Sequence, residues 1–344
     1  MSDELAAIVR KRNVDAALAY LEEECVYDQT RRIARYDAEY VAIPIRQAIE
    51  HPLIKRIDAG VAGEPRAHSL EDHLRRRGWS DTDIERIPTS YARIGECIVF
   101  SEPIGYQPEV VAEALFAIHG EAKAVVEQRA ITGSHRRPQI SHIAGIDDTH
   151  TIHREHGIVY ELDLSEVMFS PGNQHERKRM GDVVVPSERV LDMCAGIGYF
   201  TLPMAVNGAQ VTAIERNPVS FRWLSRNLTH NGVDALVTPI CGDCRETPVT
   251  ADRVVLGFLD AHDARDGRPE SKGYLASAVN AVDTVGTIHI HGITWAGEHE
   301  DARVSLLDRI ESLDATVRSM SVHTVKTIAP GTEHIVFDVN LKSR

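Results

Sequence analysis

The architecture of this chain follows from one segment, Val190-Leu-Asp-Met-Cys-Ala-Gly-Ile-Gly-Tyr-Phe200. A short apolar run reaches an acidic residue and a glycine-rich turn, and the pattern then predicts a helix that begins at Tyr199. Glycine at positions 196 and 198 removes the Cβ atoms that would keep a ligand away from the backbone. The segment therefore predicts a strand–loop–helix unit whose loop a ligand can approach closely.

Two more apolar runs follow, and each ends close to a carboxylate. Residues 209–214 run directly into Glu215, and residues 235–240 are followed by Cys-Gly-Asp243. A carboxylate at the end of the second strand is suited to bind ribose hydroxyls, and we expect Asp243 to bind an adenine amine. Because parallel strands end at the same edge of a sheet, the three ends predict a nucleoside pocket there.

The glycine-rich loop also indicates the kind of nucleoside. A dinucleotide site would read Gly-x-Gly-x-x-Gly, whereas here the third glycine is missing and Asp192 would repel a pyrophosphate. The loop resembles the S-adenosylmethionine motif of Rossmann-like transferases, whose ligand is cationic. The expected cofactor contacts are then Asp192, Gly196, Gly198, Glu215 and Asp243. A Rossmann-like domain with an emptied pocket is the structural alternative.

Composition limits the cellular setting of the protein. No apolar run approaches the roughly 20 residues of a membrane span, and the acidic N-terminus has no signal-peptide pattern. The chain has five cysteines, an uneven number that is spread over a large sequence. Such a set indicates reduced thiols and a cytoplasmic protein. The net charge of −13 argues by itself against nucleic acid. A global charge is not a local field, however, so the position of basic clusters matters more.

The order of apolar patterns predicts an α/β protein with three parts. Residues 1–85 form a small N-terminal α/β module, residues 86–175 a middle mixed α/β module, and residues 176–344 a C-terminal Rossmann-like domain. The expected helices cover 3–25, 70–76 and 108–117, and the expected strands cover 40–45, 91–100, 123–128, 157–163, 253–256, 287–291 and 334–339.

Two segments beside the Rossmann-like domain are locally basic. Residues 128–146 contain several arginines and no acid, and residues 173–181 contain three basic residues and His175 against one glutamate. Clustered cations of this kind are typical phosphate contacts, although either segment alone could be an exposed loop. The RNA-binding candidates are Arg129, Arg136, Arg137, Lys178 and Arg179.

The succession of motifs carries a family resemblance. Phe169-Ser-Pro-Gly-Asn-Gln-His-Glu-Arg-Lys-Arg179 precedes the sheet, and 192–200, Ala213-Ile-Glu-Arg-Asn-Pro218, 227–232 and Cys241-Gly-Asp243 follow in order. This succession resembles an archaeal and eukaryotic group that contains two tRNA enzymes. One is the N1-guanine methyltransferase that acts beside the anticodon, and the other is the wybutosine-pathway aminocarboxypropyltransferase.

The resemblance favours the second of these enzymes. The methyltransferases carry Asn-Leu-Pro after the fourth strand, whereas this chain has Asp252-Arg-Val-Val-Leu-Gly-Phe-Leu259, which is similar to the aminocarboxypropyltransferase branch. Ile288-His-Ile-His291 is similar to that branch too. The family's cofactor contacts correspond to Ser170, Arg177, Glu215, Asp243 and Cys244.

The resemblance also implies an activity and its partners. S-Adenosylmethionine would be the co-substrate, and carbon 7 of 4-demethylwyosine at position 37 of tRNA(Phe) would be the acceptor. The middle module would bind tRNA, Arg177 and Ser170 would position the methionine arm, and no obligate protein partner is evident. The general base has no candidate. Alternatives are tRNA guanine-N1 methylation, or an RNA-binding module without turnover.

Several histidines and cysteines could suggest a metal, but we expect none. Cys241 and Cys244 form a CxxC without a second ligand pair. His150, His153 and His156 could share a helical face, but Asp147 and Asp148 before them indicate a loop. His289 and His291 lie on one side of a strand, where we expect a hydrogen-bonded core pair.

Overall fold

The computed structural model describes residues 5–28, 31–61, 63, 69–133, 136–259 and 273–343. The chain forms two compact units, one of Met1–Thr89 with Gly105–Gly120 and one of Ser90–Ile104 with Glu121–Arg344. The chain therefore passes between the units three times. The division into three domains at 85/86 and 175/176 stays a prediction.

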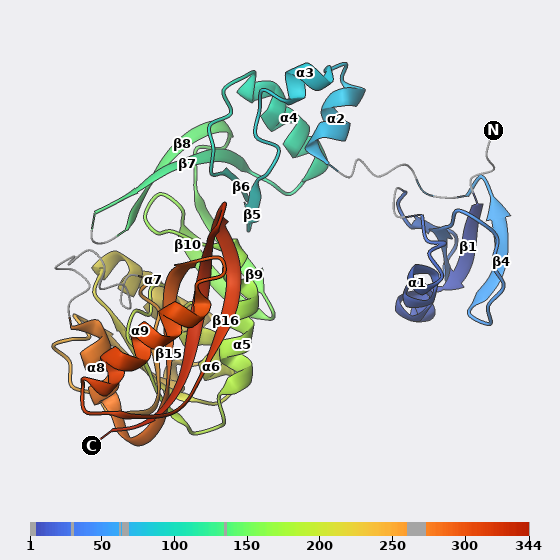
Figure 1. Ribbon diagram of the computed structural model, residues 1–344. Coiled ribbons are helices and arrows are strands. Elements are labelled where there is room, and N and C mark those ends of the chain that lie inside the picture. The colour runs from blue at the N-terminus through green and yellow to red at the C-terminus, as the bar shows by residue number, and fades with distance from the viewer. Residues whose placement is uncertain are drawn as a thin grey trace. The chain divides into compact units, whose positions relative to one another are not determined.

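The N-terminal part of the first unit is an antiparallel sheet in the order β2-β3-β1-β4, accompanied by one helix (Figure 1). Alternate residues of β1 contribute to two small apolar clusters, which include Val9 and Ile8 respectively. The bounds are β1 Leu5–Arg10, α1 Val14–Glu23, β2 Ala34–Arg35, β3 Tyr40–Pro44 and β4 Ile54–Ala59.

The prediction of one helix over residues 3–25 is wrong for its first part. Strand β1 lies between two neighbours and is buried on both faces, so its apolar residues form a continuous run. Such a run cannot be told from a buried helix by periodicity. The predicted strand at 40–45 is confirmed as β3, and it ends at Pro44.

Three short helices complete the first unit, and their caps explain where two of them begin. They are α2 Leu70–Arg76, α3 Asp81–Ile84 and α4 Pro108–Ile118. The Ser69 side chain accepts a hydrogen bond from the Asp72 amide, and Ser80 forms a capping box with Asp83. The predicted helix over 70–76 is confirmed residue for residue.

The second unit begins with a four-stranded sheet in the order β5-β6-β7-β8 and a β9–β10 hairpin. The predicted single strand over 91–100 is instead a hairpin, because the chain turns at Gly95, whose φ is +56°. The histidine segment beginning at His150 is a strand, so the expected loop is wrong. The bounds are β5 Ala92–Ile94, β6 Cys97–Phe100, β7 Ala124–Thr132, β8 Arg137–Gly145, β9 His150–Glu155 and β10 Ile158–Asp163.

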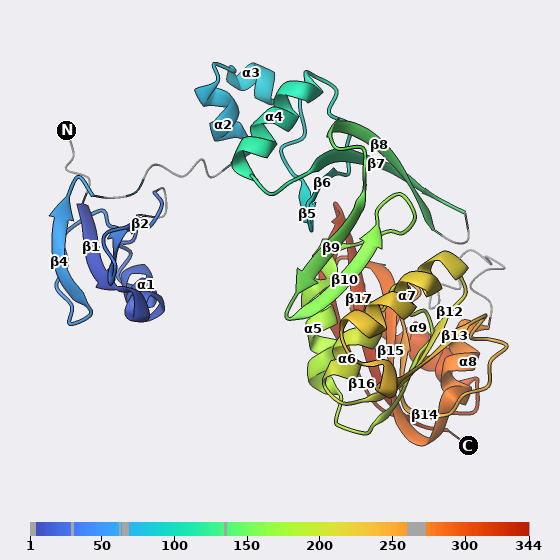
Figure 2. The same cartoon turned by 180° about the vertical axis from the view of Figure 1, so that it is seen from behind.

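The main sheet of the second unit has the strand order β13-β12-β11-β14-β15-β17-β16 in the described residues (Figures 1 and 2). The first five strands in this order run parallel, and β17 is antiparallel to both neighbours. The strands are β11 Arg189–Asp192, β12 Gln210–Glu215, β13 Val237–Cys241, β14 Ala251–Leu256, β15 Val282–Trp295, β16 Thr316–Ala329 and β17 Thr332–Lys342, and the helices are α5 Gln174–Val183, α6 Thr201–Val206, α7 Pro218–His230, α8 Tyr274–Ala281 and α9 His299–Glu311.

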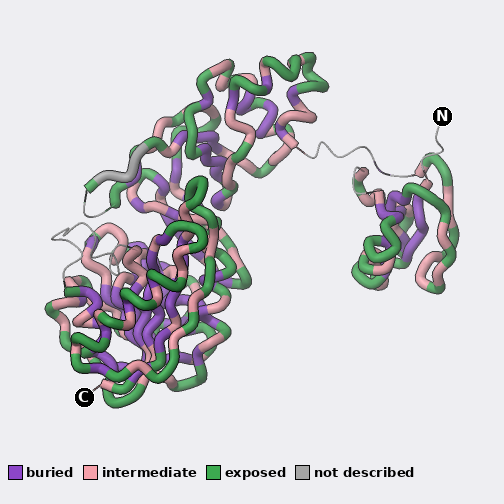
Figure 3. Tube along the Cα trace, in the orientation of Figure 1, coloured by how far each residue is buried: buried purple, intermediate pink, exposed green. Residues whose placement is uncertain are grey.

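Helices cover both faces of this sheet, and alternate residues of each strand face opposite cores. Val190 packs in the cluster that contains Leu202 of α6 and Leu224 of α7. Its neighbour Leu191 packs in the cluster that contains Leu275 of α8. The central strands are accordingly buried on both sides, and Figure 3 shows buried residues gathered in the interior of this unit.

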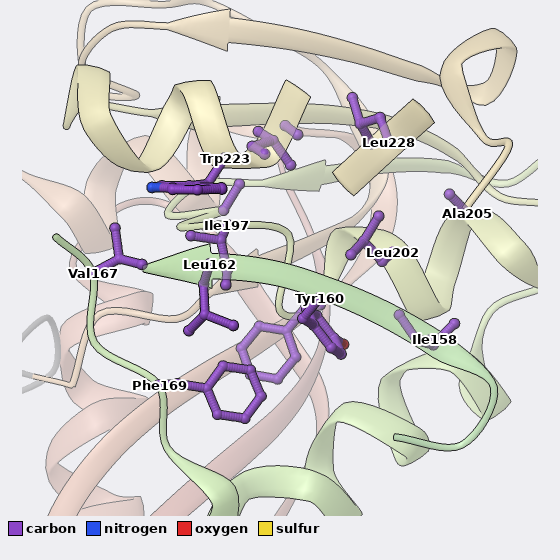
Figure 4. Close-up of a cluster of buried hydrophobic side chains, with 14 of the residues drawn as sticks. Ile158, Tyr160, Leu162, Val167, Phe169, Ile197, Leu202, Ala205, Trp223 and Leu228 are labelled. Atoms are coloured by element: carbon purple, nitrogen blue, oxygen red, sulfur yellow. The ribbon is translucent and has the colours of Figure 1, made fainter. Parts of the chain in front are cut away.

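The β9–β10 hairpin packs on the α6–α7 side through an apolar cluster (Figure 4). The Tyr160 and Phe169 rings meet edge to face with centroids 5.5 Å apart, and the Tyr160 hydroxyl donates to the Tyr199 carbonyl at 3.2 Å. These contacts fix the segment that precedes Ser170 against the glycine-rich loop. No described helix is long and apolar enough to cross a membrane.

Candidate functional site

A cavity of about 380 Å³ lies at the carboxyl ends of β11 to β14. Each of these four strand ends contributes to its lining. Gly196 follows β11, Glu215 ends β12, Asp243 follows β13 and Gly257 follows β14. The cavity is thus at the edge where ligands bind in open α/β sheets, as the strand ends predicted.

The glycine-rich loop and Glu215 form one hydrogen-bonded unit. Gly196 has a φ of +58°, and a Cβ there would lie 2.5 Å from the Tyr199 ring. Its amide donates to Glu215 Oε2 at 2.7 Å, and the Asn217 amide donates to Glu215 Oε1 at 2.6 Å. Both bonds hold the carboxylate of Glu215 in the wall of the cavity, where it can accept from ribose hydroxyls.

Asp243 is a permanently charged acceptor at the same end of the cavity. The side chain of Arg245 binds both of its oxygens, and this hydrogen bonding lowers the pKa of Asp243 to about 2. Cys244, which also lines the cavity, is buried. The carboxylate can therefore accept from an exocyclic amine at any physiological pH.

The opposite end of the cavity is cationic and is built around Arg177. This side chain is 2% exposed and donates to both oxygens of Glu155, at 2.7 and 2.8 Å, and to the Ser170 carbonyl at 3.0 Å. Its guanidinium lies 4.7 Å from the centroid of the Phe169 ring. The pair with Glu155 and the stacking fix the orientation of Arg177.

Lys326 is a second cation at this end, and no motif in the sequence predicts it. Its Nζ donates to Ser170 Oγ at 2.7 Å, and burial lowers its pKa. Lys326 is on β16, far from every motif in the sequence, and only the pairing of β16 with β17 brings it here. Together with Arg136, which also lines the cavity, it makes this end suitable for a carboxylate.

Asp192 and Gly198 are the two expected cofactor contacts that do not line the cavity. Asp192 is fully buried behind the loop, where it accepts from the Thr201 hydroxyl at 2.7 Å and the Cys194 amide at 3.4 Å. Gly198 has a φ of +104° and packs against Leu202. Ser170, Arg177, Gly196, Glu215, Asp243 and Cys244 all line the cavity.

The burial of Asp192 makes stability depend on pH. Burial raises the pKa of its carboxyl to about 6, from an ordinary value of 3.8. Folding thus favours the protonated form, and the resulting stability is fully present below pH 3.8 and is lost as the pH rises to about 6. We expect Asp192→Asn to remove this loss.

Urea unfolding across this pH range checks the expectation. As the pH rises to about 6, the free energy of unfolding of the wild type should fall relative to that of Asp192→Asn. Above that pH the difference between the two proteins should stay constant. Asp234→Asn, at an exposed position, is the control. Parallel curves for wild type and Asp192→Asn over the whole range would contradict the argument.

Gly198 provides a separate test of the loop. A Cβ there would lie 2.8 Å from Leu202 Cγ and 3.2 Å from Leu224 Cδ1. We expect Gly198→Ala to cost about 2–4 kcal/mol of stability, from overpacking and backbone strain together. Gly232 also has a positive φ, +65°, but a Cβ added there would meet no atom within 4 Å, so Gly232→Ala is the matched control. It should cost only about 1–2 kcal/mol, and equal losses in urea unfolding would contradict the packing argument.

The five RNA-binding candidates differ in position and exposure. Arg129 and Arg137 are exposed on β7 and β8, Arg129 pairs with Glu127, and Arg136 lines the cavity. Lys178 is exposed but pairs with Asp182. Arg179 binds both Glu176 and Asp338, which leaves it a poorer phosphate ligand than the others. RNA contact by these residues stays a prediction.

The histidines of β15 behave differently from one another. His289 is paired at both nitrogens, with Asp338 and Arg253, as expected for a core residue. His291 is buried too, but it lines the cavity and its Nε2 has no hydrogen-bond partner in the described part of the chain, so the expected satisfied core pair is wrong for this residue. Within the described ranges, no group of three or more His, Cys, Asp or Glu side chains could hold a metal.

The sheet order, the glycine-rich loop and the two differently charged ends of the cavity define a class. The chain is a Rossmann-like, S-adenosylmethionine-dependent transferase. Residues 151–320 match the TRM5/TYW2 methyltransferase domain, and residues 70–149 match the TYW2 N-terminal domain.

Individual relatives agree with these matches. The tRNA(Phe) (4-demethylwyosine(37)-C(7)) aminocarboxypropyltransferase of Pyrococcus horikoshii is 30% identical over 265 residues, which cover 75% of this chain and 91% of that protein. The tRNA (guanine(37)-N(1))-methyltransferase Trm5b of Pyrococcus abyssi is 33% identical over 261 residues, which cover 73% of this chain and 74% of that protein. The chain belongs to the TRM5/TYW2 family.

Solved structures show the same relationship. The structure of Pyrococcus abyssi Trm5b has a TM-score of 0.71 at 26% identity and covers 98% of this chain and 99% of that chain. Methanocaldococcus jannaschii TYW2 in complex with AdoMet has a TM-score of 0.57 at 27% identity and covers 74% of this chain and 100% of that chain.

Proposed function

We propose that the protein transfers the 3-amino-3-carboxypropyl group of S-adenosylmethionine to carbon 7 of 4-demethylwyosine at position 37 of tRNA(Phe). 5′-Methylthioadenosine would be the by-product. The observation that supports this most is the end of β14, where Gly257 and Leu259 line the cavity in place of Asn-Leu-Pro. This edge offers a small, apolar surface to the acceptor base.

The two ends of the cavity suggest how the reacting carbon is chosen. Glu215 and Asp243 would hold the nucleoside, and Arg177 would bind the methionine carboxylate, with Ser170 and Lys326 beside it. The nucleophile must approach one carbon of the sulfonium to ~3–3.5 Å, in line with the departing sulfur. Anchoring the carboxylate at the cationic end would turn the γ-carbon, rather than the methyl group, toward the acceptor.

The acceptor is a base within tRNA, which must leave its stack to reach the cavity. Arg136 lines the cavity, and the exposed side chains of Arg129 and Arg137 lie on the same two-stranded segment of β7 and β8. These three belong to the five candidates for phosphate contacts. Substituting them should weaken tRNA binding and reduce its dependence on salt.

The by-product decides between this function and its alternative. We would incubate the protein with S-adenosylmethionine and tRNA(Phe) that carries 4-demethylwyosine, and then identify the nucleoside product and the tRNA mass. 5′-Methylthioadenosine with a gain of one aminocarboxypropyl group is the expected result. S-Adenosylhomocysteine would overturn it. The second candidate, guanine-N1 methylation, is favoured by the similarity to Trm5b and predicts that product on unmodified tRNA.

A further inference from the structure

Two buried histidines meet in the wall of the cavity. His291 of β15 and His334 of β17 both line it and are 1% and 2% exposed. His291 Nδ1 lies 3.0 Å from His334 Nε2, so the two rings share one hydrogen bond. The outer nitrogens, His291 Nε2 and His334 Nδ1, have no hydrogen-bond partner among the described residues. Unpaired buried polar atoms are rare in native proteins and are costly, which points to a functional reason for this pair.

The pair lies between the acceptor edge and the cationic end of the cavity. Val255 and Leu256 of β14 are in register with His289 and Ile290 of β15, so Gly257 and His291 follow side by side. The Phe200 ring stacks on His291, with centroids 4.9 Å apart. Charged groups flank the pair. Glu176 Oε1 is 4.0 Å from His291 Nε2, and the positive charge of Lys326 adds to burial in lowering the pKa of His334.

The number of protons on the two rings determines what the pair can do. Burial lowers the pKa of both rings, that of His334 to about 4, so both are neutral at physiological pH. Two neutral rings that share one hydrogen bond always leave one outer nitrogen with a free lone pair. The negative charge of Glu176 near His291 Nε2 favours a proton on that nitrogen, which leaves the lone pair on His334 Nδ1.

We infer that the His334–His291 pair accepts the proton that the acceptor carbon loses, and that His334 Nδ1 is the atom that receives it. This inference rests on the proposed function. The acceptor carbon first forms a bond with the γ-carbon while the bond from the γ-carbon to sulfur breaks, and sulfur leaves as a neutral thioether. The ring system then carries the positive charge. Loss of the proton to His334 restores its aromaticity, and the imidazolium releases the proton to water when the product leaves.

A weak base is sufficient for this step. The cationic ring formed by carbon–carbon bond formation is a strong carbon acid, because loss of its proton restores an aromatic system. A neutral imidazole of low pKa can therefore remove that proton. The bond to His291 allows the added charge to be shared between two rings and to lie near the carboxylate of Glu176.

The test uses His334→Gln and His291→Gln in the full chain. Glutamine keeps a hydrogen-bonding group but cannot take up a proton. We expect kcat to fall by about 10²-fold for His334→Gln, while the affinity for S-adenosylmethionine stays at the wild-type value. Proton loss should then become rate-limiting, so tRNA deuterated at the acceptor carbon should show a primary isotope effect that the wild type lacks. His291→Gln should show the same effect more weakly.

His323→Gln, an exposed histidine on the neighbouring strand β16, is the matched control. An unchanged kcat in both variants would overturn the inference. A lower kcat without an isotope effect would overturn it too, because it would assign the rings a structural role. If the wild type itself forms no 5′-methylthioadenosine, the proposed function fails, and this inference fails with it. These outcomes are distinguishable, because the wild type is measured first.

Discussion

Replacement of Arg177 by methionine is expected to lower the free energy of unfolding by about 3–5 kcal/mol and to abolish turnover. The Glu155 side chain is 6% exposed, and both of its oxygens accept from Arg177. Removal of the guanidinium leaves this carboxylate buried, with His153 as its remaining side-chain hydrogen-bond partner among the described residues. The same change removes the anchor proposed for the methionine carboxylate.

A double variant separates the two consequences. The double variant Arg177→Met/Glu155→Gln no longer contains the unpaired carboxylate. Its free energy of unfolding, measured by chemical denaturation, should therefore return most of the way to the wild-type value. Turnover should stay absent, because the cavity still lacks the guanidinium proposed to anchor the methionine carboxylate. Lys178→Met changes the next residue of α5, an exposed lysine paired with Asp182, and should alter stability by no more than about 0.5 kcal/mol. Recovery of turnover in the double variant would confine Arg177 to a role in folding.

The second large effect is expected at Glu215. Its carboxylate accepts from the amides of Gly196 and Asn217, and it is the predicted ribose ligand. In Glu215→Gln, the side-chain NH2 group replaces one carboxylate oxygen. It would then point its own N–H toward the backbone N–H of Gly196 or Asn217, and neither of the two can accept a hydrogen bond. We expect S-adenosylmethionine to bind about 1.5–3 kcal/mol more weakly, which is roughly 10- to 100-fold in Kd.

Isothermal titration calorimetry measures this loss directly. 5′-Methylthioadenosine lacks the methionine carboxylate, so it should lose about as much affinity as S-adenosylmethionine if Glu215 binds the ribose. Glu246→Gln, an exposed acid on the loop after β13, is the matched control. Unchanged binding of both ligands to a folded Glu215→Gln protein would rule out the ribose contact.

The parallel strands of the main sheet were predictable because their signals are local. Strand β12 ends in Glu215, and Asp243 and Gly196 follow the ends of β13 and β11 by two and four residues, so each strand and its contribution to the site are read together. The helix Leu70–Arg76 was predictable for a similar reason, since the Ser69 cap marks where it begins.

The errors have physical causes that a local reading cannot detect. Strand β1 is buried on both faces by two neighbours, so its residues match a helical pattern equally well. At Gly95 a tight turn converts one apparent strand into two. Asp192 stays a predicted cofactor contact, although its side chain is buried and accepts a hydrogen bond from Thr201.

Lys326, His291 and His334 show a different limitation. They meet at the cavity only because β17 inserts antiparallel between β15 and β16. Nothing near Lys326 or His334 in the sequence indicates a site, and the pairing of these strands is decided by tertiary contacts. The half of the cavity built by parallel strands was therefore predictable, and the half built by antiparallel strands was not.

The ends of the main sheet also bear on how the protein behaves in concentrated solution. Its outermost strands are β13, which is short and contains Pro239, and β16, whose pairing with β17 shifts register at three places. Proline removes a donor from an edge, and bulges twist an edge away from a flat template. Both borders thus resist strand addition by a second molecule, which should keep this seven-stranded sheet from seeding aggregates.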